Sequence, residues 1–327
     1  MNVTSSHNRF ETLDRRLSMQ AFGETFIDAL PRHIANLRVP DRALSDDVRR
    51  GPLFTQIEGT SALQSALREV LHHAVTQEAQ SFAERAMEVF LQKKELDVGV
   101  LKFFNGWHET HKTTSLVSAR IIMRLAADAL SVPGRQQPTY LTALAHMHEV
   151  AKDDFGLGHP GHDGMYGYLT AAFGAHHWAD AQYSVDACVD FSAFLHDIGI
   201  AHHKAAMESP AHRQSIMDAM MVSVASELWN GREYNFLAQY MEEKLVSFAP
   251  GLAHDAGRLR YAKAYVLGHA GDVENRHGLH ALAAAQVYGR AVGAEFSIDR
   301  LKKVLLEYTR RVGEAWRGLQ AALLCGQ

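Results

Sequence analysis

The chain has 327 residues, enough for one large helical domain or two small ones, and its hydrophobic fraction of 47% is ordinary for a globular protein. A formal net charge of -4 argues against a nucleic-acid-binding surface. The two cysteines, Cys188 and Cys325, exclude a disulfide framework and a thiolate metal site. Because we find no signal peptide and no apolar run long enough to span a membrane, we expect a cytoplasmic protein.

Apolar residues recur at helical spacing along most of the chain, and no stretch alternates as a β-strand would. The sequence therefore predicts an all-α protein. We expect residues 1–55 to form an irregular arm with one helix near 17–30, and residues 56–327 to form a single helical domain. The helices predicted within this domain cover residues 61–94, 98–130, 138–155, 162–174, 179–205, 209–246, 256–291 and 297–323.

The stretch from His146 to Gly174 carries the densest set of metal-ligand side chains. Four histidines and four carboxylates lie within the 18 residues from His146 to Asp163, and a glycine-rich turn divides them. Because glycine permits a tight turn, a carboxylate on one helix can face a histidine on the next. Nitrogen and oxygen ligands without cysteine suit iron, manganese or zinc. The alternative is a polar helix end followed by a loop.

A second stretch of this kind runs from Tyr265 to Ala283 and includes His269, Asp272, Glu274, His277 and His280. Glu274 and His277 are one helical turn apart and can reach the same metal centre. A pair of neighbouring metals accommodates the whole set better than a single metal does. The alternative is a charged, partly exposed helix.

Glu227 is a third candidate, because it lies close to an apolar stripe formed by Met220, Val224 and Leu228. A carboxylate in such a place is unfavourable unless it is paired, protonated or bound to a metal. The alternative is a buried ion pair with Arg213 or Arg232.

The run from Asp153 to Gly158, followed by His162, Tyr166 and Gly174, resembles the Asp-Glu-x-Gly-x-Gly…His segment of haem-oxygenase-like diiron oxidases, a family of iron-containing redox enzymes. The resemblance covers roughly residues 100–285. It implies a haem-oxygenase-like helical bundle that binds two irons, or one, and no haem. It also implies reductive activation of O2, an external electron donor, and a small amine, amino acid or aliphatic acid as substrate. The resemblance is also compatible with a homodimer.

The resemblance also implies a set of iron ligands: Asp154, His162, Glu227, His269, Glu274 and His277. Three residues are rivals for places in this set: Glu149 for Asp154, His159 for His162, and Asp272 for Glu274. The family's last ligand helix reads His-x3-Asp/Glu-x2-His, whereas His269, Glu274 and His277 follow a pattern one residue longer. We therefore predict a break in the helix between Gly268 and His277, such as a π-bulge, that turns the three side chains toward one another.

Two other functions compete with this one. The run from Phe194 to Gly199 contains His196 and Asp197 and resembles the His-Asp pair of HD-type metal-dependent phosphohydrolases, with His202, His203 and His212 following. His196 also fits the pattern of a core histidine. The remaining alternative is a non-catalytic helical scaffold. Weaker signals are the Glu69…His72 spacing, typical of ferritin-like bundles, and the segment 107–111, which we interpret as pocket lining or as partners of the metal ligands.

Overall fold

The computed structural model describes residues 16–40, 57–134, 137–152, 154–155, 161–201, 205–207, 209–294 and 296–325. These residues are almost entirely helical and contain no β-strand, so the prediction of an all-α protein is confirmed. No helix in this described part of the chain has the length and apolar character needed to cross a lipid bilayer.

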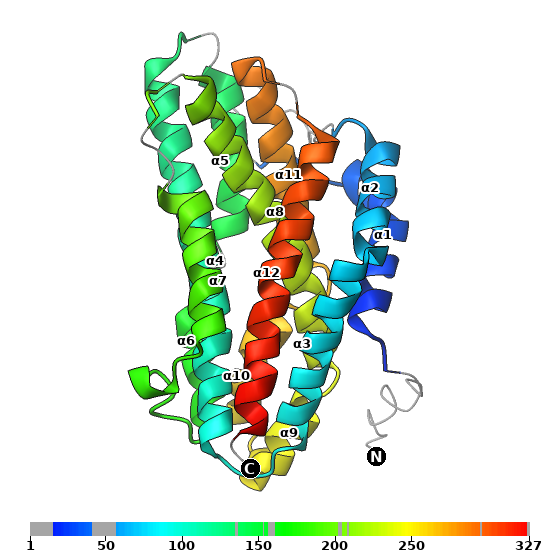
Figure 1. The fold of residues 1–327 in the computed structure, drawn as a ribbon, viewed down its shortest axis with the longest axis vertical. Helices are drawn as coiled ribbons and strands as arrows, with labels where there is room; N and C mark the ends of the chain where they lie inside the picture. The colour runs from blue at the N-terminus through cyan, green and yellow to red at the C-terminus, as the bar shows by residue number, and fades with distance from the viewer. Residues whose placement is uncertain are drawn as a thin grey trace, which may run out of the picture.

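The helices form an elongated bundle (Figure 1). In chain order they are α1 (Met19–Ala35), α2 (Thr60–His72), α3 (Ala74–Gln92), α4 (Val98–Ser131), α5 (Gln137–Ala151), α6 (His162–Ala172), α7 (Asp186–His196), α8 (Pro210–Ala238), α9 (Met241–Phe248), α10 (Ala256–His269), α11 (Val273–Val292) and α12 (Ile298–Leu324). Three short turns of other helical type join them: η3 (Ala181–Tyr183), η4 (Asp197–Ala201) and η5 (Pro250–His254).

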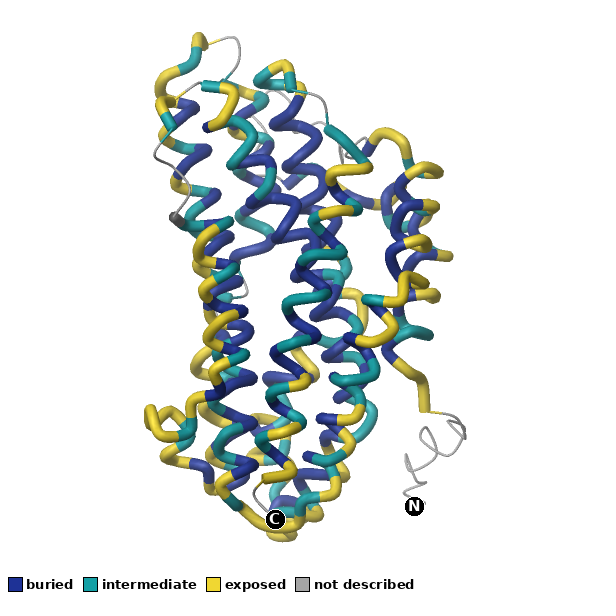
Figure 2. Tube along the Cα trace, in the orientation of Figure 1, coloured by how far each residue is buried: buried dark blue, intermediate teal, exposed yellow. Residues whose placement is uncertain are grey.

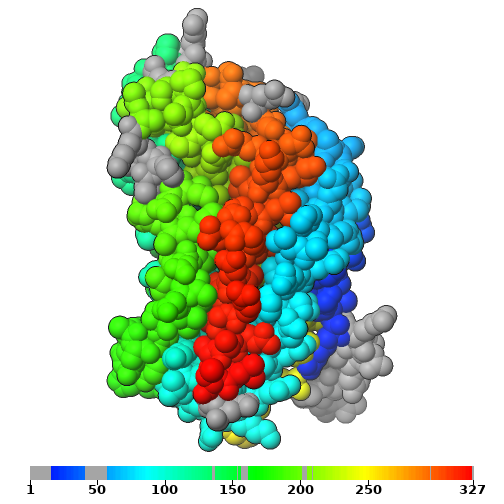
Figure 3. Space-filling model, in the orientation of Figure 1, coloured from blue at the N-terminus to red at the C-terminus, as the bar shows by residue number. Residues whose placement is uncertain are grey.

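The last helix, α12, packs against α3, α4 and α7 and runs down the middle of the view in Figure 1. Its buried residues, among them Leu301, Leu305, Tyr308, Val312 and Trp316, recur every three or four positions and so form one apolar stripe. The other side of α12 faces solvent, as the space-filling view shows (Figure 3). Removing this stripe from water is what holds α12 on the bundle.

Helix α8 lies inside the bundle, where it packs against α4, α10, α11 and α12. Most of its residues from Ile216 to Leu237 are buried on every side, and buried segments face the interior throughout the bundle (Figure 2). Two carboxylates, Glu227 and Glu233, lie within this buried part of α8. Each therefore requires a partner in the protein interior.

Several predicted helices are interrupted. The helix expected over 61–94 is wrong as a single element, because His73 has extended backbone angles between α2 and α3 and its ring accepts a hydrogen bond from the backbone N–H of Val75. The stretch 209–246 divides into α8 and α9, and the stretch 179–205 contains η3, α7 and η4. In each case a local hydrogen bond or a turn overrides a continuous apolar pattern.

The break predicted between Gly268 and His277 is present, but it is not a π-bulge. Helix α10 ends at His269, and α11 begins at Val273. Between them Gly271 has a φ of 76°, which glycine adopts without a steric penalty. The Asn235 side chain bridges this turn, since its amide donates to the Gly271 carbonyl at 2.9 Å and its oxygen accepts from the Gly271 N–H at 2.8 Å. The chain thus ends α10 and begins a separate helix, α11.

Candidate metal centre

Six side chains converge in the interior as two groups of three. We call the first the His–His–Asp group, and its members are Asp154, His162 and His269. The second, the Glu–Glu–His group, consists of Glu227, Glu274 and His277. Within each group the potential ligand atoms all lie within 4.8 Å of one another, and every member except the half-buried Asp154 is buried. These are the six residues that the sequence suggested, and their role as ligands stays a prediction.

The His–His–Asp group is built from the ends of three helices. Asp154 lies just after α5, and His162 is the first residue of α6. The backbone N–H of His162 donates to the carbonyl of Asp154 at 3.0 Å, which keeps the two residues together across the turn. His269, the last residue of α10, completes the group, and its ring centroid lies 4.9 Å from that of His162.

The two imidazoles of this group are suited to bind a cation. The Nδ1 of His269 donates to the carbonyl of Tyr265 at 2.5 Å, so its Nε2 carries no proton in the neutral ring and remains available as a ligand. Burial lowers the pKa of both His162 and His269, and neighbouring histidines add to the effect at His162. Both rings are therefore neutral at pH 7, as metal ligation requires.

The Glu–Glu–His group brings two carboxyl groups into contact inside the protein. Ligand-type atoms of Glu227 on α8, Glu274 on α11 and His277 all lie within 4.8 Å of one another, and the Nδ1 of His277 lies 3.7 Å and 3.9 Å from the Oε2 atoms of the two glutamates. Burial and the neighbouring Glu274 raise the pKa of Glu227 well above its usual value. Burial acts in the same direction on Glu274, but its contacts with His277 and His269 outweigh it and lower the pKa of that carboxyl.

This pair keeps a proton between two buried carboxylates, a position that a cation can take. The Oε1 atom of Glu274 is buried and has no hydrogen-bond partner among the described residues. An orphaned carboxylate oxygen is unfavourable in the interior, and a metal ion would satisfy it. The close packing of α8 against α11 depends on Gly278, because a Cβ at that position would lie 3.4 Å from the Cβ of Glu227 and 3.2 Å from Leu228.

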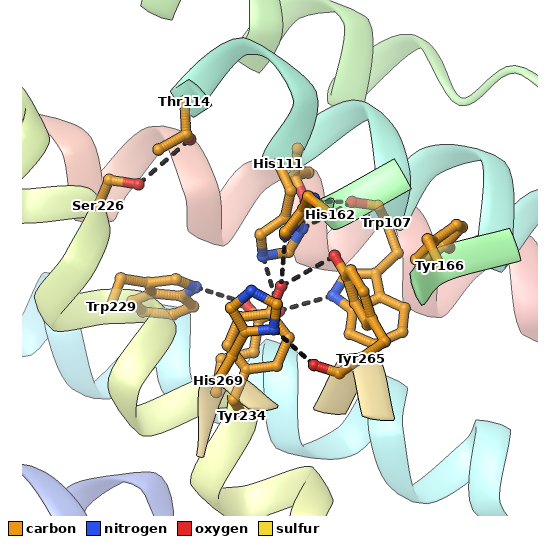
Figure 4. A network of polar contacts seen from close by, with 12 residues as sticks. Trp107, His111, Thr114, His162, Tyr166, Ser226, Trp229, Tyr234, Tyr265 and His269 are labelled. Atoms are coloured by element: carbon orange, nitrogen blue, oxygen red, sulfur yellow. Dashed lines mark hydrogen bonds and ion pairs between the residues drawn. The ribbon is translucent and has the colours of Figure 1, made fainter. Parts of the chain in front are cut away.

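A third buried carboxylate, Glu233, was not predicted. It accepts hydrogen bonds from the indole N–H groups of Trp107 at 2.6 Å and Trp229 at 2.7 Å, and the Nε2 of His111 lies 3.2 Å away (Figure 4). The Nδ1 of His111 faces the Trp107 carbonyl at 2.8 Å. Since both ring nitrogens face acceptors, His111 is protonated. Burial opposes this charge, but Glu233 outweighs burial and raises the pKa of His111.

The pair formed by His111 and Glu233 lies beside the His–His–Asp group. The His111 ring is 6.1 Å from that of His162 and 5.5 Å from that of Tyr234. Trp107 and His111 thus lie next to the candidate ligands, and the role expected of residues 107–111 stays a prediction. Glu233 follows Trp229 by one helical turn, and this i, i+4 spacing within an apolar helix is the one sequence signal that it offered.

Two of the three rival ligands, Glu149 and Asp272, belong to neither group. Glu149 contacts Lys152, with 2.6 Å between its Oε2 and the lysine Nζ. Asp272 precedes α11, and its side chain is exposed, whereas Glu274 is buried. His159 lies outside the described residues. The geometry thus favours Asp154 over Glu149 and Glu274 over Asp272.

The His-Asp pair of the phosphohydrolase hypothesis lies on the surface. The side chains of His196 and Asp197 are 56% and 73% exposed, so the prediction of a core histidine is wrong for His196. His212 is buried, but it contacts Asp128 at 3.0 Å, and His202 and His203 lie outside the described residues. Neither His196 nor Asp197 belongs to a three-residue cluster of metal-ligand type in the part of the chain that the structure describes.

Two other predicted positions also lie away from the two groups. The carboxylate of Glu69 is exposed on α2 and contacts Lys302, and His72 is half exposed on the same helix. His280 is buried and its Nδ1 lies 2.8 Å from that of His146, so the two rings join α11 to α5. Burial lowers the pKa of His146 to about 4 and, together with the nearby His146, that of His280 to about 2.

The two groups offer three nitrogen and three carboxylate ligands with no sulfur, a donor set suited to iron, manganese or zinc. Glu274 lies close enough to His269 for each to influence the pKa of the other, so the two groups are neighbours. Comparisons of this chain with models of protein families, with curated proteins and with solved structures found no match.

Proposed function

We propose that the protein is a non-haem iron enzyme that holds two irons, one at each group, and uses O2 to oxidise a small organic substrate. The observation that carries the proposal is the convergence of six ligand-type side chains from four helices and one turn into two adjacent buried groups. A buried set of this kind is unfavourable unless a cation occupies it. A structural ion pair would leave no carboxylate oxygen without a partner, as Glu274 does.

The donor set supports iron in particular. Structural zinc is normally bound by four ligands that close the site, often including cysteine, whereas each group here supplies three without sulfur. Three protein ligands leave positions open for O2 and substrate, and two histidines with one carboxylate are the set found in non-haem Fe(II) oxygenases. Iron bound at these groups would supply the electrons that reduce O2.

The protein's own residues prepare the site for that chemistry. The carbonyl of Tyr265 orients His269, and the proton between Glu227 and Glu274 leaves when a cation arrives. His111 holds a positive charge beside the His–His–Asp group, where it stabilises negative charge that develops during reduction of O2. Burial of both groups excludes bulk water and strengthens these interactions.

The substrate and the electron source are proposed from the sequence resemblance. A small amine, an amino acid or an aliphatic acid is the substrate class that it implies, and an external donor is needed to return iron to Fe(II). Sites in helical bundles are usually built between facing helices, which is where α6, α8, α10 and α11 bring these residues.

Anaerobic titration with Fe(II) tests the proposal. The metal-free protein should bind two Fe(II) per chain, one for each group, and exposure to O2 should then oxidise the bound iron faster than free Fe(II) in the same buffer. Folded protein that takes up no Fe(II) would contradict the proposal. Hydrolysis of a phosphate ester with Mn(II), sensitive to His196→Ala and insensitive to Glu227→Gln, would support the phosphohydrolase instead.

A further inference from the structure

The geometry points to Tyr234 as an additional ligand, a phenolate that binds iron at the His–His–Asp group. This inference rests on the proposed function and concerns one residue that the sequence did not suggest. Tyr234 lies on α8, two turns beyond Glu227, and is fully buried. Phenolate is a hard oxygen ligand, and Fe(III) is a hard cation that binds such oxygen well.

The hydroxyl of Tyr234 lies close to one of the candidate ligands. The Tyr234 oxygen lies 3.5 Å from the Nε2 of His162. Two ligand atoms that are each about 2.0–2.2 Å from one metal are about 3–3.5 Å apart at tetrahedral or octahedral angles. The ring of Tyr234 also stacks on that of His269, with 4.8 Å between centroids and 25° between planes. The phenol is thus aimed at the space that two ligands of the group share (Figure 4).

The contacts of the Tyr234 hydroxyl also differ from those of other buried tyrosines. Other buried tyrosines near the site donate to a strong acceptor or to a serine: Tyr166 to the Phe104 carbonyl at 2.6 Å, and Tyr308 to Ser226 at 3.3 Å. The Tyr234 hydroxyl donates to that of Tyr265 at 2.9 Å, and its oxygen also lies 3.5 Å from the Nε2 of His162, a candidate ligand. Burial raises the pKa of Tyr234, so the phenolate forms only when a cation replaces its proton, and the Tyr265 hydroxyl can then turn to donate to it.

Binding of Tyr234 to iron exchanges a proton for a metal ion on the phenol oxygen. The O–H bond of Tyr234 breaks, its proton passes to solvent, and an Fe(III)–O bond forms. No electron moves in that step. The Fe(III) is made beforehand from Fe(II) by a one-electron oxidant, ferricyanide in the experiment below. The phenolate then completes a set of one carboxylate, two imidazoles and one phenolate.

Optical spectroscopy tests the inference without relying on turnover. Wild-type protein is loaded with Fe(II) without O2, its iron content is measured, and ferricyanide is added. We expect an intense visible absorption band from phenolate-to-Fe(III) charge transfer and resonance Raman bands of a bound phenolate. Tyrosine deuterated on the ring should shift those Raman bands, which identifies a tyrosine ligand without any substitution.

Three variants identify the residue. Tyr234→Phe, which removes one hydroxyl and keeps the ring, should abolish the band per bound iron. Tyr265→Phe should shift the band, because the phenolate loses its hydrogen-bond donor. Tyr166→Phe is the matched control and should leave the band unchanged, because that hydroxyl is held by the Phe104 carbonyl.

The outcomes separate this inference from the proposed function. Iron uptake by the wild-type protein without a phenolate band, or a band that survives in Tyr234→Phe, overturns the ligand assignment and leaves the iron enzyme standing. Failure of the wild-type protein to take up iron overturns both.

Discussion

At the scale of single residues, the interior of α8 contains two carboxylates that are stabilised in opposite ways. Glu227 lies against Glu274 and holds a proton, since two adjacent buried carboxylates cannot both ionise. Glu233 instead lies 3.2 Å from His111, whose pKa it raises, and accepts hydrogen bonds from two indoles. The two residues therefore respond differently to the same substitution.

Glu227→Gln should remove iron from the Glu–Glu–His group while leaving the metal-free protein stable. Glutamine resembles the protonated form of Glu227, so the free energy of unfolding should change by less than about 1 kcal/mol. Iron content should fall to that of the other group, as measured by elemental analysis beside a urea-unfolding curve.

Glu233→Gln is the matched control on the same helix. It leaves the charge of His111 without its partner, and breaking a buried pair of this kind costs about 3–5 kcal/mol. Iron content should be retained. If Glu227→Gln were the more destabilising variant, or bound iron normally, the assignment of Glu227 as a ligand would be wrong.

The sequence indicated the candidate ligands but not Glu233, and this difference has a physical reason. Ligands such as Glu274 and His277 lie within one helical turn, so their spacing already indicates that they can act together. Glu233 offers only its i, i+4 spacing from Trp229, and its other indole partner, Trp107, is 126 residues away in the chain. No local pattern reports on a contact of that separation.

At the scale of the helices, the turn between α10 and α11 determines how His269 and Glu274 face each other. The sequence predicted where this break lies, because the ligand spacing has one residue too many for a straight helix. It did not predict its form, since Asn235, which bridges the turn, comes from α8.

Gly271→Ala should weaken iron binding as well as stability. Alanine at a φ of 76° costs roughly 1–2 kcal/mol, and relief of that strain would rotate α10 against α11. The expected result is a similar loss in the free energy of unfolding and at least a several-fold weaker affinity for Fe(II), measured by anaerobic titration.

Gly293→Ala provides the comparison, because Gly293 has a φ of 67° at the end of α11, away from the six ligands. It should show the same loss of stability with unchanged affinity for Fe(II). Equal affinities in both variants would mean that the turn at Gly271 does not position the ligands.

The contact of α5 with α11 should make the fold sensitive to acid. The pKa values of His146 and His280, about 4 and about 2, lie below the value near 6.5 of an unfolded chain. The unfolded chain therefore binds more protons below pH 6.5. The stability from this contact is fully present above that pH and is lost as the pH falls toward 4.

The variant His280→Gln tests this acid sensitivity, because His280 has the lower pKa of the two histidines in the folded protein. The stability of the wild type relative to this variant should fall by roughly 1.4 kcal/mol per pH unit below pH 6.5 for each histidine that the substitution affects. The exposed His254→Gln should give a curve parallel to that of the wild type. Parallel curves for His280→Gln as well would contradict the prediction.

Helix boundaries show the same limit of sequence analysis. The prediction for residues 98–130 agrees closely with α4, Val98–Ser131, because Asp97 caps its start with a hydrogen bond to the Val100 N–H. The break at His73 was missed, because a histidine that caps a helix through its ring has no recognisable sequence signal. Helix ends with a common capping residue can be predicted from the sequence, whereas ends with an unusual cap cannot.

At the scale of the whole molecule, the six candidate ligands lie on helices that are distant in the sequence. The six ligands come from α6, α8, α10, α11 and the turn after α5, so a cation that binds them opposes unfolding of all five. Fe(II) in hundredfold excess over its dissociation constant should add about 2.7 kcal/mol to the free energy of unfolding.

The thermal unfolding midpoint should therefore rise by several degrees with Fe(II), and continue to rise with its concentration. Anaerobic calorimetry measures this shift, with Mg(II) as the control cation, since it prefers sites built of oxygen ligands. Iron that binds without raising the midpoint would be bound somewhere other than the interior.

The two indoles that donate to Glu233 place intrinsic fluorophores beside the candidate metal centre. Trp107 and Trp229 are two of the four tryptophans, and both are buried and held by that one carboxylate. Bound iron quenches the emission of nearby indoles, so the intrinsic fluorescence should fall as the site fills. Trp178→Phe with Trp316→Phe should leave this response in place, and occupancy can then be followed in real time without an added dye.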